Sequence, residues 1–273
     1  MFNNDNDINK NPFSQNMQLF YATEQMSKQN QCSLIYATLD EKSNLDDLIK
    51  GNNIAGMLFV SYIPPHVLEQ CVKAKIPAVC VNNRYTEIIS IAPENERGSF
   101  EAVRYLQSKG HKKIAIILGK PNYYSTSERF RGYSAAMHLA AQNVDPRYVL
   151  EGDWSFDGAR EAIFSMLDKV PRDELPTAIF CCSDAMAIGA MDALKERDFS
   201  IPNDISIMGF DNVQQSEQVY PRLSTVSVDI AQMAELVMEK LLSSNYDDIR
   251  KKGYIIQLPT ELKLRQSVKE IRT

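Results

Sequence analysis

The chain has 273 residues, 44% of them hydrophobic and 24% charged, with a formal net charge of −5. This composition is that of a folded globular protein, and the length suits about two compact domains. The negative charge excludes a protein that holds nucleic acid through an overall positive surface, and no apolar run has the length of a membrane-spanning helix.

The N-terminus and the cysteines indicate the compartment. Residues 1–12 are rich in Asn and Asp, which predicts a loop and differs from a signal peptide. The five cysteines lie in apolar runs and lack the spacing of metal ligands. They are Cys32, Cys71, Cys80, Cys181 and Cys182. Because an odd number of buried thiols is typical of a reducing compartment, we expect a cytoplasmic protein without metal, cofactor or membrane attachment.

Helical and extended patterns alternate through the first part of the chain. A helix begins at Phe13, with an apolar face formed by Met17, Phe20, Tyr21 and Met26. The strands predicted after it are residues 33–37, 56–60, 78–81, 88–91 and 113–118. The predicted helices lie near residues 45–49, 64–72 and 94–110.

The alternation begins again after residues 119–125, a loop that contains Pro121 and Asn122. The helices predicted there are residues 127–142, 157–168, 184–194 and 229–242. The strands are residues 148–150, 178–182, 205–210, 224–228 and 254–258. This double alternation predicts an α/β protein with two doubly wound parallel-sheet lobes, and we place the change of lobe within the loop 119–125.

Residues 177–212 form the clearest strand–helix–strand unit. Ser183 and Asp184 can cap the helix that follows the first strand, and Asp211 ends the second strand. Such a unit requires parallel strands and a right-handed crossover. Ligands of doubly wound sheets bind at the carboxyl ends of the strands, so we expect Ser183 and Asp211 beside a ligand cleft.

The motifs of common enzymes on such a fold are absent from the sequence. It contains no G-x-G, no G-x-S-x-G and no phosphate loop, since Gly119-Lys120 is followed by Pro121. The three histidines, His66, His111 and His138, are scattered. We therefore expect neither catalytic residues nor a metal site.

Six segments in fixed order carry a family pattern. They are Asn11-Pro12-Phe13, KGHKKIAIILG (109–119), ERFRGYSAA (128–136), SDAMAIGA (183–190), IPNDISIMGFDN (201–212) and PRLSTV (221–226). Together they resemble the effector-binding core of the lactose/galactose repressor (LacI/GalR) family. The resemblance covers nearly the whole chain.

This resemblance implies a periplasmic-binding-protein-like pair of lobes joined by three crossovers. The first lobe would be residues 1–118 plus 229–258, and the second would be residues 119–228 plus 259–273. The implied function is that of a homodimeric transcriptional repressor, whose small sugar-like effector closes the lobes and allosterically controls operator DNA binding. The alternative effectors are a purine and a phosphosugar.

The resemblance also implies three main ligand-binding residues. Arg129 matches the effector-binding arginine of the family, and its guanidinium suits two vicinal hydroxyls or a carboxylate. Asp211 would accept from sugar hydroxyls, although an Asp-Asn pair also forms turns. Trp154, the single tryptophan, would stack on a sugar or a purine, or else pack in the core. Arg131 is expected on the surface.

Further candidates are weaker or have a simpler structural explanation. Phe13 would touch the effector or act as a hydrophobic staple. Ser183 would bind the ligand or cap its helix, and it stands where many relatives have Asn. Ser61 and Ser125 lie on loops expected beside the cleft. Glu94 stands where the family often has the Asp of an Asp-Asn pair, or else only caps the helix.

The family normally begins with a DNA-binding helix-turn-helix, which has no counterpart here, and only Met1 and Phe2 would remain of its first strand. We expect a piece of a longer repressor that reaches operator DNA only through that helix-turn-helix. One alternative is a solute-binding protein of a sugar transport system, which would carry a signal peptide or lipoprotein cysteine. The other is an enzyme, which would need a nucleophile–base or metal constellation.

Overall fold

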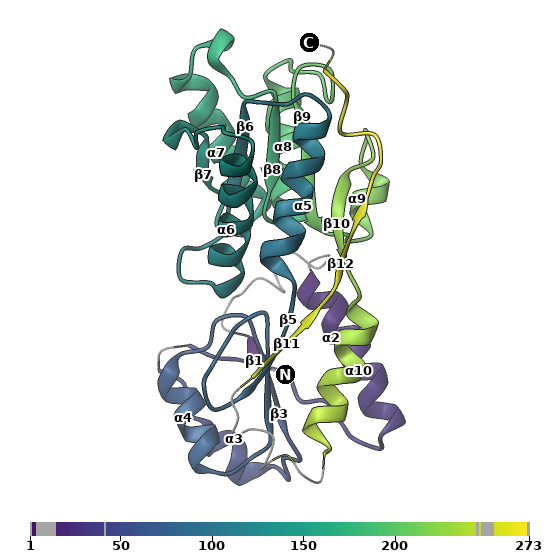
Figure 1. Ribbon diagram of the computed structural model, residues 1–273. Coiled ribbons are helices and arrows are strands. Elements are labelled where there is room, and N and C mark those ends of the chain that lie inside the picture. Colours follow the sequence, from purple (N-terminus) through teal and green to yellow (C-terminus); the bar gives the residue numbers. More distant parts are fainter. Residues whose placement is uncertain (1, 4–14, 41, 244–245, 247–253, 272–273) are drawn as a thin grey trace. The chain divides into compact units, whose positions relative to one another are not determined.

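The computed structural model describes residues 2–3, 15–40, 42–243, 246 and 254–271 (Figure 1). The chain divides into two compact units, each made of two separate stretches. The first unit is Met1–Pro93 with Asp229–Pro259, and the second is Glu94–Val228 with Thr260–Thr273. The chain therefore passes between the units three times, in agreement with the predicted three crossovers.

The first unit contains a six-stranded sheet of order β11-β5-β4-β3-β1-β2, in which the described pairs are parallel. Its strands are β1 (Phe2–Asn3), β2 (Ala37–Thr38), β3 (Met57–Val60), β4 (Ala78–Val81), β5 (Ile89–Pro93) and β11 (Ile255–Leu258). β3, β4 and β5 are buried along their whole length, because helices cover both faces of a parallel sheet.

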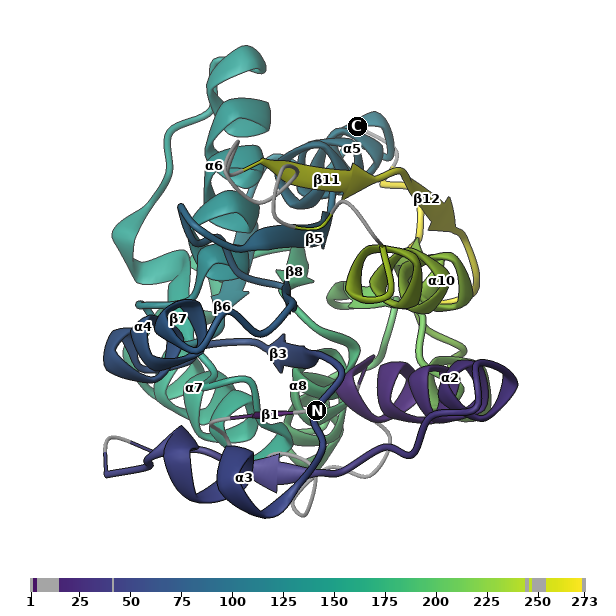
Figure 2. The same cartoon turned by 90° about the horizontal axis from the view of Figure 1, so that it is seen from below.

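Figure 2 shows these helices in two pairs. α2 (Gln15–Gln29) and α10 (Ile230–Leu241) pack side by side on one face of the sheet. α3 (Leu45–Gly51) and α4 (Pro65–Lys73) lie on the other face, over a core that includes Phe59.

The predicted apolar face of α2 is wrong. Leu19, Thr23 and Ser27 are buried, whereas Tyr21 is 55% exposed. The two hydroxyls can be buried because they donate within their own helix. Thr23 Oγ1 donates to Leu19 O at 2.7 Å, and Ser27 Oγ donates to Thr23 O at 2.8 Å.

The second unit contains a six-stranded sheet of order β12-β10-β9-β8-β6-β7, parallel except for the antiparallel pair β10–β12. Its strands are β6 (Ile114–Leu118), β7 (Val149–Glu151), β8 (Ala178–Cys181), β9 (Ser206–Asp211), β10 (Ser224–Val228) and β12 (Thr260–Lys263). β8 and β9 pair in parallel, which confirms the strand–helix–strand unit predicted within residues 177–212.

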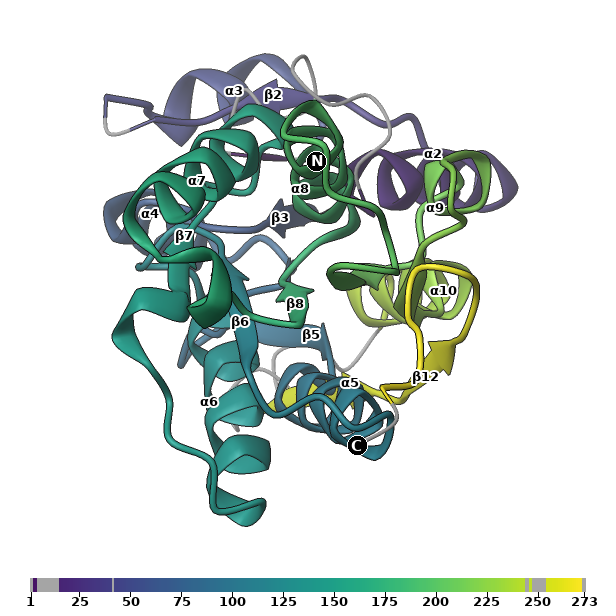
Figure 3. The ribbon, with the colours of Figure 1, turned by 90° about the horizontal axis from the view of Figure 1, so that it is seen from above.

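Helices cover both faces of this sheet as well. α5 (Asn95–Ser108) and α6 (Tyr124–Leu139) lie on one face, and α7 (Phe156–Lys169) and α8 (Asp184–Glu196) on the other (Figure 3). The short helix α9 (Gln215–Gln218) and the 3-10 helices Pro146–Tyr148 and Arg172–Glu174 complete the described elements of the unit. No helix in the described ranges is long and apolar enough to cross a membrane.

The boundary predicted after residue 118 needs correction. β6 pairs with β7 and β8, and α5 packs against α6, so residues 94–118 belong to the second unit. The change of unit therefore falls after Pro93 and not in the loop 119–125. Alternation of strands and helices does not reveal which sheet a strand will join.

Three further elements differ from the prediction. The strand expected at residues 33–37 is a strand only at Ala37–Thr38. β12 and α9 were not predicted, because TELK and QSEQ are polar segments without an apolar pattern. β12 forms as an edge strand, where polar side chains are tolerated.

Candidate functional site

A cluster of buried polar groups lies at the carboxyl ends of the central strands of the second unit. Asp211 is the last residue of β9, and Cys182 follows β8. Since β8 and β9 are parallel neighbours, these ends lie at the same edge of the sheet. Arg129, on α6, reaches both residues and is 2% exposed.

The guanidinium of Arg129 is held by three acceptors. Its Nε donates to Asn95 Oδ1 at 2.8 Å, and its Nη1 donates to the carbonyl of Cys182 and lies 3.5 Å from Asp211 Oδ1. An arginine has five N–H donors, so these contacts leave the Nη2 amino group for a further acceptor. Arg129 is therefore fixed in place while part of its donor fork remains for a ligand.

Aromatic rings fix the plane of the same guanidinium. Arg129 Cζ lies 3.6 Å from the ring centroid of Phe210 and 5.7 Å from that of Trp154. Both rings attract the cation through their π faces. A planar cation on an aromatic ring is a role that lysine does not reproduce.

Close helix packing brings Arg129 to Asn95. A Cβ added at Gly132 would lie 2.1 Å from the carbonyl oxygen of Glu96, so α6 approaches α5 at a distance that only glycine allows. Arg129 lies one turn before Gly132 on α6, and Asn95 is the first residue of α5. The glycine three places after the arginine thus serves the geometry of the site.

Burial affects the protonation of the Asp211 carboxyl group. It raises the pKa of Asp211 to about 6, against the opposing effect of the Arg129 guanidinium. Burial likewise lowers the pKa of Arg129, with Asp211 acting in the opposite direction. At neutral pH both groups are charged, so the site presents a cationic donor beside an anionic acceptor.

Asp184 lies close by but is engaged by the protein itself. Its Oδ1 accepts from Thr225 Oγ1 at 2.5 Å, and its Oδ2 accepts from the Val213 amide at 2.9 Å. Burial, followed by the nearby Asp211 charge, raises the pKa of Asp184 well above its usual range. These contacts hold the segment after β9 to β10, so Asp184 does not offer a free carboxylate.

Trp154 lies in the turn between β7 and α7, with its ring against Gly119. A Cβ added at Gly119 would lie 1.9 Å from Trp154 Cε2. Trp154 and Asp153 have positive φ angles of 60° and 53°, which for non-glycine residues cost about 1–3 kcal/mol each and cluster at functional sites. The indole Nε1 is buried with no hydrogen-bond partner in the described part of the chain, so this donor is available to a ligand.

The structure therefore brings three predicted residues together, namely Arg129, Asp211 and Trp154. Ser183 caps α8, because its Oγ accepts from the Met186 amide at 3.2 Å. Ser125 is buried in the first turn of α6. Ser61 belongs to the first unit, where it follows β3 and its Oγ accepts from Asn16 Nδ2 at 3.4 Å.

The remaining residues named in the sequence analysis are Phe13, Arg131 and Glu94. Phe13 is outside the described residues. The side chain of Arg131 is 60% exposed and pairs with Glu128 and Glu96, as expected for a surface residue. Glu94 precedes α5 without a side-chain capping bond and pairs with Arg97 at 3.1 Å, so the alternative that its side chain caps the helix is wrong.

Sequence reasoning missed Asn95, Phe210 and the Cys182 carbonyl as partners of Arg129. Phe210 lies next to Asp211 in an apolar strand, where it resembles any core residue. A backbone carbonyl carries no sequence signal at all. The only sequence signal for Asn95 is that it is a polar residue next to Glu94, at the start of a predicted helix.

Comparisons with known proteins show that the chain is similar to bacterial regulators. A family model described as a periplasmic binding protein-like domain matches residues 103–268. Catabolite control protein A of Priestia megaterium is 31% identical over 237 residues, which cover 84% of this chain and 69% of that protein. The ribose operon repressor of Haemophilus influenzae is 31% identical over 239 residues, which cover 85% and 70%.

A solved structure agrees with the same grouping. The crystal structure of a regulatory protein of the LacI family from Chloroflexus aggregans has a TM-score of 0.79 and 28% identity, over 93% of this chain and 92% of that one. Other curated repressors match over about half of their own length, with shares of 54%, 51% and 53%.

Proposed function

The chain belongs to the LacI/GalR family of transcriptional regulators, and from that premise we propose that it is the effector-sensing core of such a regulator. Its effector is a small sugar-like molecule bound by Arg129, Asp211 and Trp154. Effector binding controls operator DNA recognition by a helix-turn-helix outside this chain. The protein acts in the cytoplasm as a homodimer and catalyses no reaction.

The pairing of Arg129 with Asp211 is the observation that carries this proposal. Arg129 Nη1 and Asp211 Oδ1 lie 3.5 Å apart, so a charged donor and a charged acceptor are adjacent. Each hydroxyl of a vicinal diol both donates and accepts, and two such hydroxyls match this pair of opposite functions. The face of Trp154 would cover the apolar C–H face of the same sugar.

The charge of the site distinguishes among effector classes. Asp211 is ionised at neutral pH and would repel a phosphate placed beside it, which favours a neutral sugar over a phosphosugar. A purine remains the alternative, because Trp154 could stack on it. One relative is named the ribose operon repressor, which is consistent with a sugar.

Additional contacts are proposed for four serine and aromatic positions. The Ser183 hydroxyl accepts from the Met186 amide and still has its own proton to donate to a ligand. Ser125, Ser61 and Phe13 are proposed as further contacts, on the resemblance alone.

The mechanism proposed is a shift between two conformations. An effector changes their populations only by the difference between its affinities for them, so the contacts of Arg129 and Asp211 must differ between the two. Regulation of transcription is favoured over solute transport because the relatives are described as a repressor and a LacI-family regulatory protein.

A thermal-shift screen tests the proposal. The chain is heated with neutral sugars, sugar phosphates and purines, and a ligand at about 100 times its Kd should stabilise it by about 2.7 kcal/mol. We expect a neutral sugar to raise the Tm, and Arg129→Ala and Trp154→Ala to reduce the rise clearly while circular dichroism shows folded variants. Absence of any shift across the panel, or a shift that both variants retain, would overturn the proposal.

A further inference from the structure

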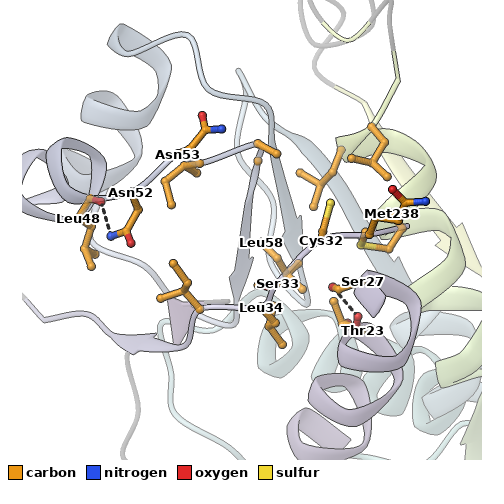
Figure 4. Close-up of a pocket in the computed structure, with 17 residues that line it drawn as sticks. Thr23, Ser27, Cys32, Ser33, Leu34, Leu48, Asn52, Asn53, Leu58 and Met238 are labelled. Atoms are coloured by element: carbon orange, nitrogen blue, oxygen red, sulfur yellow. Dashed lines mark hydrogen bonds between the residues drawn. The ribbon is translucent and has the colours of Figure 1, made fainter. Parts of the chain in front are cut away.

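Polar side chains of this protein bond over very different distances in sequence. Beside the cavity of about 410 Å³ in the first unit, Asn52 Nδ2 donates to Leu48 O at 3.0 Å, four residues back along the chain (Figure 4). Ser27 Oγ likewise donates to Thr23 O at 2.8 Å. In the second unit, by contrast, the guanidinium of Arg265 donates to acceptors 42 to 53 residues earlier in the chain. Arg265 therefore joins segments that chain order alone leaves far apart.

Arg265 lies two residues after β12, and its guanidinium holds the segment between β9 and β10. Both of its terminal amino groups donate twice, and only 12% of the side chain is exposed. The acceptors are Asn212 Oδ1 and Glu217 Oε1 at 2.7 Å from Nη2, and Leu223 O at 2.7 Å and Ser216 Oγ at 3.1 Å from Nη1. Because a guanidinium donates along fixed directions in one plane, these bonds fix the acceptors relative to one another.

The segment held by Arg265 begins with a turn in an unfavourable backbone conformation. Asp211 and Asn212 have positive φ angles of 117° and 55°. Asn adopts the second of these values readily, but the φ of Asp211 lies beyond the left-handed helical region and is unfavourable for a residue with a Cβ. Such a conformation persists only where the surrounding contacts impose it. The backbone of Asp211 therefore depends on the contacts of its neighbours.

Asn212 makes the contacts that hold this turn. Its Oδ1 accepts from Arg265 Nη2 at 2.7 Å, its Nδ2 donates to Ser227 Oγ at 3.2 Å, and its amide donates to Thr225 Oγ1 at 3.4 Å. The bond from Arg265 is the shortest of the three and the only one of them with a charged donor, so it is the strongest. It fixes the residue that directly follows Asp211.

We propose that Arg265 is a positioning residue of the effector site. It holds Asn212 so that Asp211 keeps its positive φ and its carboxylate stays buried, 3.5 Å from Arg129 Nη1. Arg265 acts through Asn212 and makes no contact with the effector, so the residues after β12 contribute to effector affinity from outside the site. The role in effector binding rests on the proposed function, whereas the role in holding the turn does not.

Amide hydrogen exchange of the effector-free chain tests the hold on the turn. Arg265→Ala should speed exchange at the Asn212 and Val213 amides by about tenfold or more and leave the amides of β8 unchanged, because only the turn opens. Glu217→Gln removes the charge of the other Nη2 acceptor, whose side chain is 65% exposed, and should leave these rates within about twofold. Exchange that rises equally in the turn and in β8, or in neither, would overturn the proposal.

Asn212→Gly removes the same contact from the other side. Glycine adopts the positive φ of residue 212 freely, so this variant loses the side-chain bonds without added backbone strain. It should speed exchange at Val213 as Arg265→Ala does, and the double variant should exceed the faster single variant by less than about twofold. Two effects that multiply in the double variant would mean that Arg265 acts elsewhere. Where Arg265→Ala does not fold, unchanged exchange at Val213 in Asn212→Gly is the contradicting result.

The pH profile of stability separates this role from a general structural one. Burial raises the pKa of Asp211 to about 6, so stability is lost as the pH rises from about 4 to 6. When the turn relaxes in Arg265→Ala, water reaches the carboxyl group, its pKa falls toward 3.8 and this loss becomes smaller. A profile of Arg265→Ala parallel to that of the native chain would contradict the proposal. So would a change of slope that persists in the Asp211→Asn background, because it would belong to the nearby Asp184.

Effector affinity is measured with the neutral sugar that raises the Tm most in the thermal-shift screen. Its Kd should rise about tenfold in Arg265→Ala, and by less than about twofold when Arg265→Ala is added to Asp211→Asn. If the native chain binds no sugar, the proposed function fails, while the exchange measurement still decides whether Arg265 holds the turn. If the sugar binds and Arg265→Ala leaves its Kd unchanged, Arg265 does not serve the effector site and the proposal is wrong.

Discussion

Arg129 Nη1 lies 3.5 Å from Asp211 Oδ1, and only 3% and 9% of these two side chains are exposed. Water screens such a pair poorly, so each charge depends on the other and on the neighbouring dipoles. The single contact between them does not use all the hydrogen-bonding groups of either side chain. The Arg129 Nη2 amino group and the second carboxylate oxygen of Asp211 are not used in this contact, so the pair suits a ligand with several hydroxyls.

Removal of Arg129 should destabilise the fold in a pH-dependent manner. At pH 8, Arg129→Ala removes the cation that stabilises the buried Asp211 carboxylate and should lower the free energy of unfolding by about 3–5 kcal/mol. At pH 5, Asp211 is mostly protonated and the loss should be smaller. Urea denaturation at both pH values measures the difference. Arg131→Ala, on an exposed ion pair, should change stability by no more than about 1 kcal/mol at either pH.

Asp211 should make the protein less stable as the pH rises through the acid range. Its pKa is 3.8 when unfolded and about 6 when folded, so the folded state binds the proton more tightly. The stabilisation is fully present below about pH 4 and is lost as the pH rises through about 6, a change of about 3 kcal/mol. Asp211→Asn should flatten this part of the stability profile. A profile with the same slope in the variant would assign the effect to other groups, such as Asp184.

Effector affinity should show the opposite dependence on pH. Sugar hydroxyls donate to the ionised carboxylate, so binding should weaken about tenfold for each pH unit below 6. Titrations between pH 5 and pH 8 measure this. In Asp211→Asn the remaining affinity should not vary with pH over the same range. An affinity of the native chain that is constant from pH 5 to 8 would exclude Asp211 as an ionised acceptor.

The single tryptophan should report the effector directly. Stacking of a ligand on Trp154 changes the surroundings of the only indole in the chain, so its fluorescence should shift on binding. Gly119→Ala places a Cβ within 1.9 Å of the ring and should alter the emission and weaken binding. Gly51→Ala, where no atom lies within 4 Å of the added Cβ, is the matched control. Unchanged emission with saturating effector would argue against stacking.

Much of this fold was open to prediction from the sequence because burial on both faces leaves continuous apolar runs. β3, β8 and β9 each appear as such a run, bounded by turn residues. The assignment of β6 to a sheet was not predictable in the same way. Its apolar run fits either sheet, and only its hydrogen bonds with β7 and β8 decide the matter.

The sequence could indicate only those site residues whose own side chains are suited to bind a ligand. Arg129 and Asp211 lie within two of the family segments, and Trp154 is the single tryptophan, in a loop after a predicted strand, so the sequence proposes all three as ligand contacts. The roles of Asn95 and Asp184 depend on contacts between distant segments, such as Asp184 with Thr225. The buried face of α2 was missed because Thr23 and Ser27 satisfy their hydroxyls within the helix, which an apolar pattern does not record.

Calorimetric titration of a neutral sugar, selected by the thermal-shift screen, tests the central claim most directly. Loss of one hydrogen bond to a charged group costs about 1.5–3 kcal/mol, or roughly 10–150-fold in Kd. We predict a loss in this range for Asp211→Asn and at least as large a loss for Arg129→Ala, with Arg131→Ala equal to the native chain. If all four proteins bind the sugar with the same Kd, the effector site lies elsewhere and the account of Arg129 and Asp211 is contradicted.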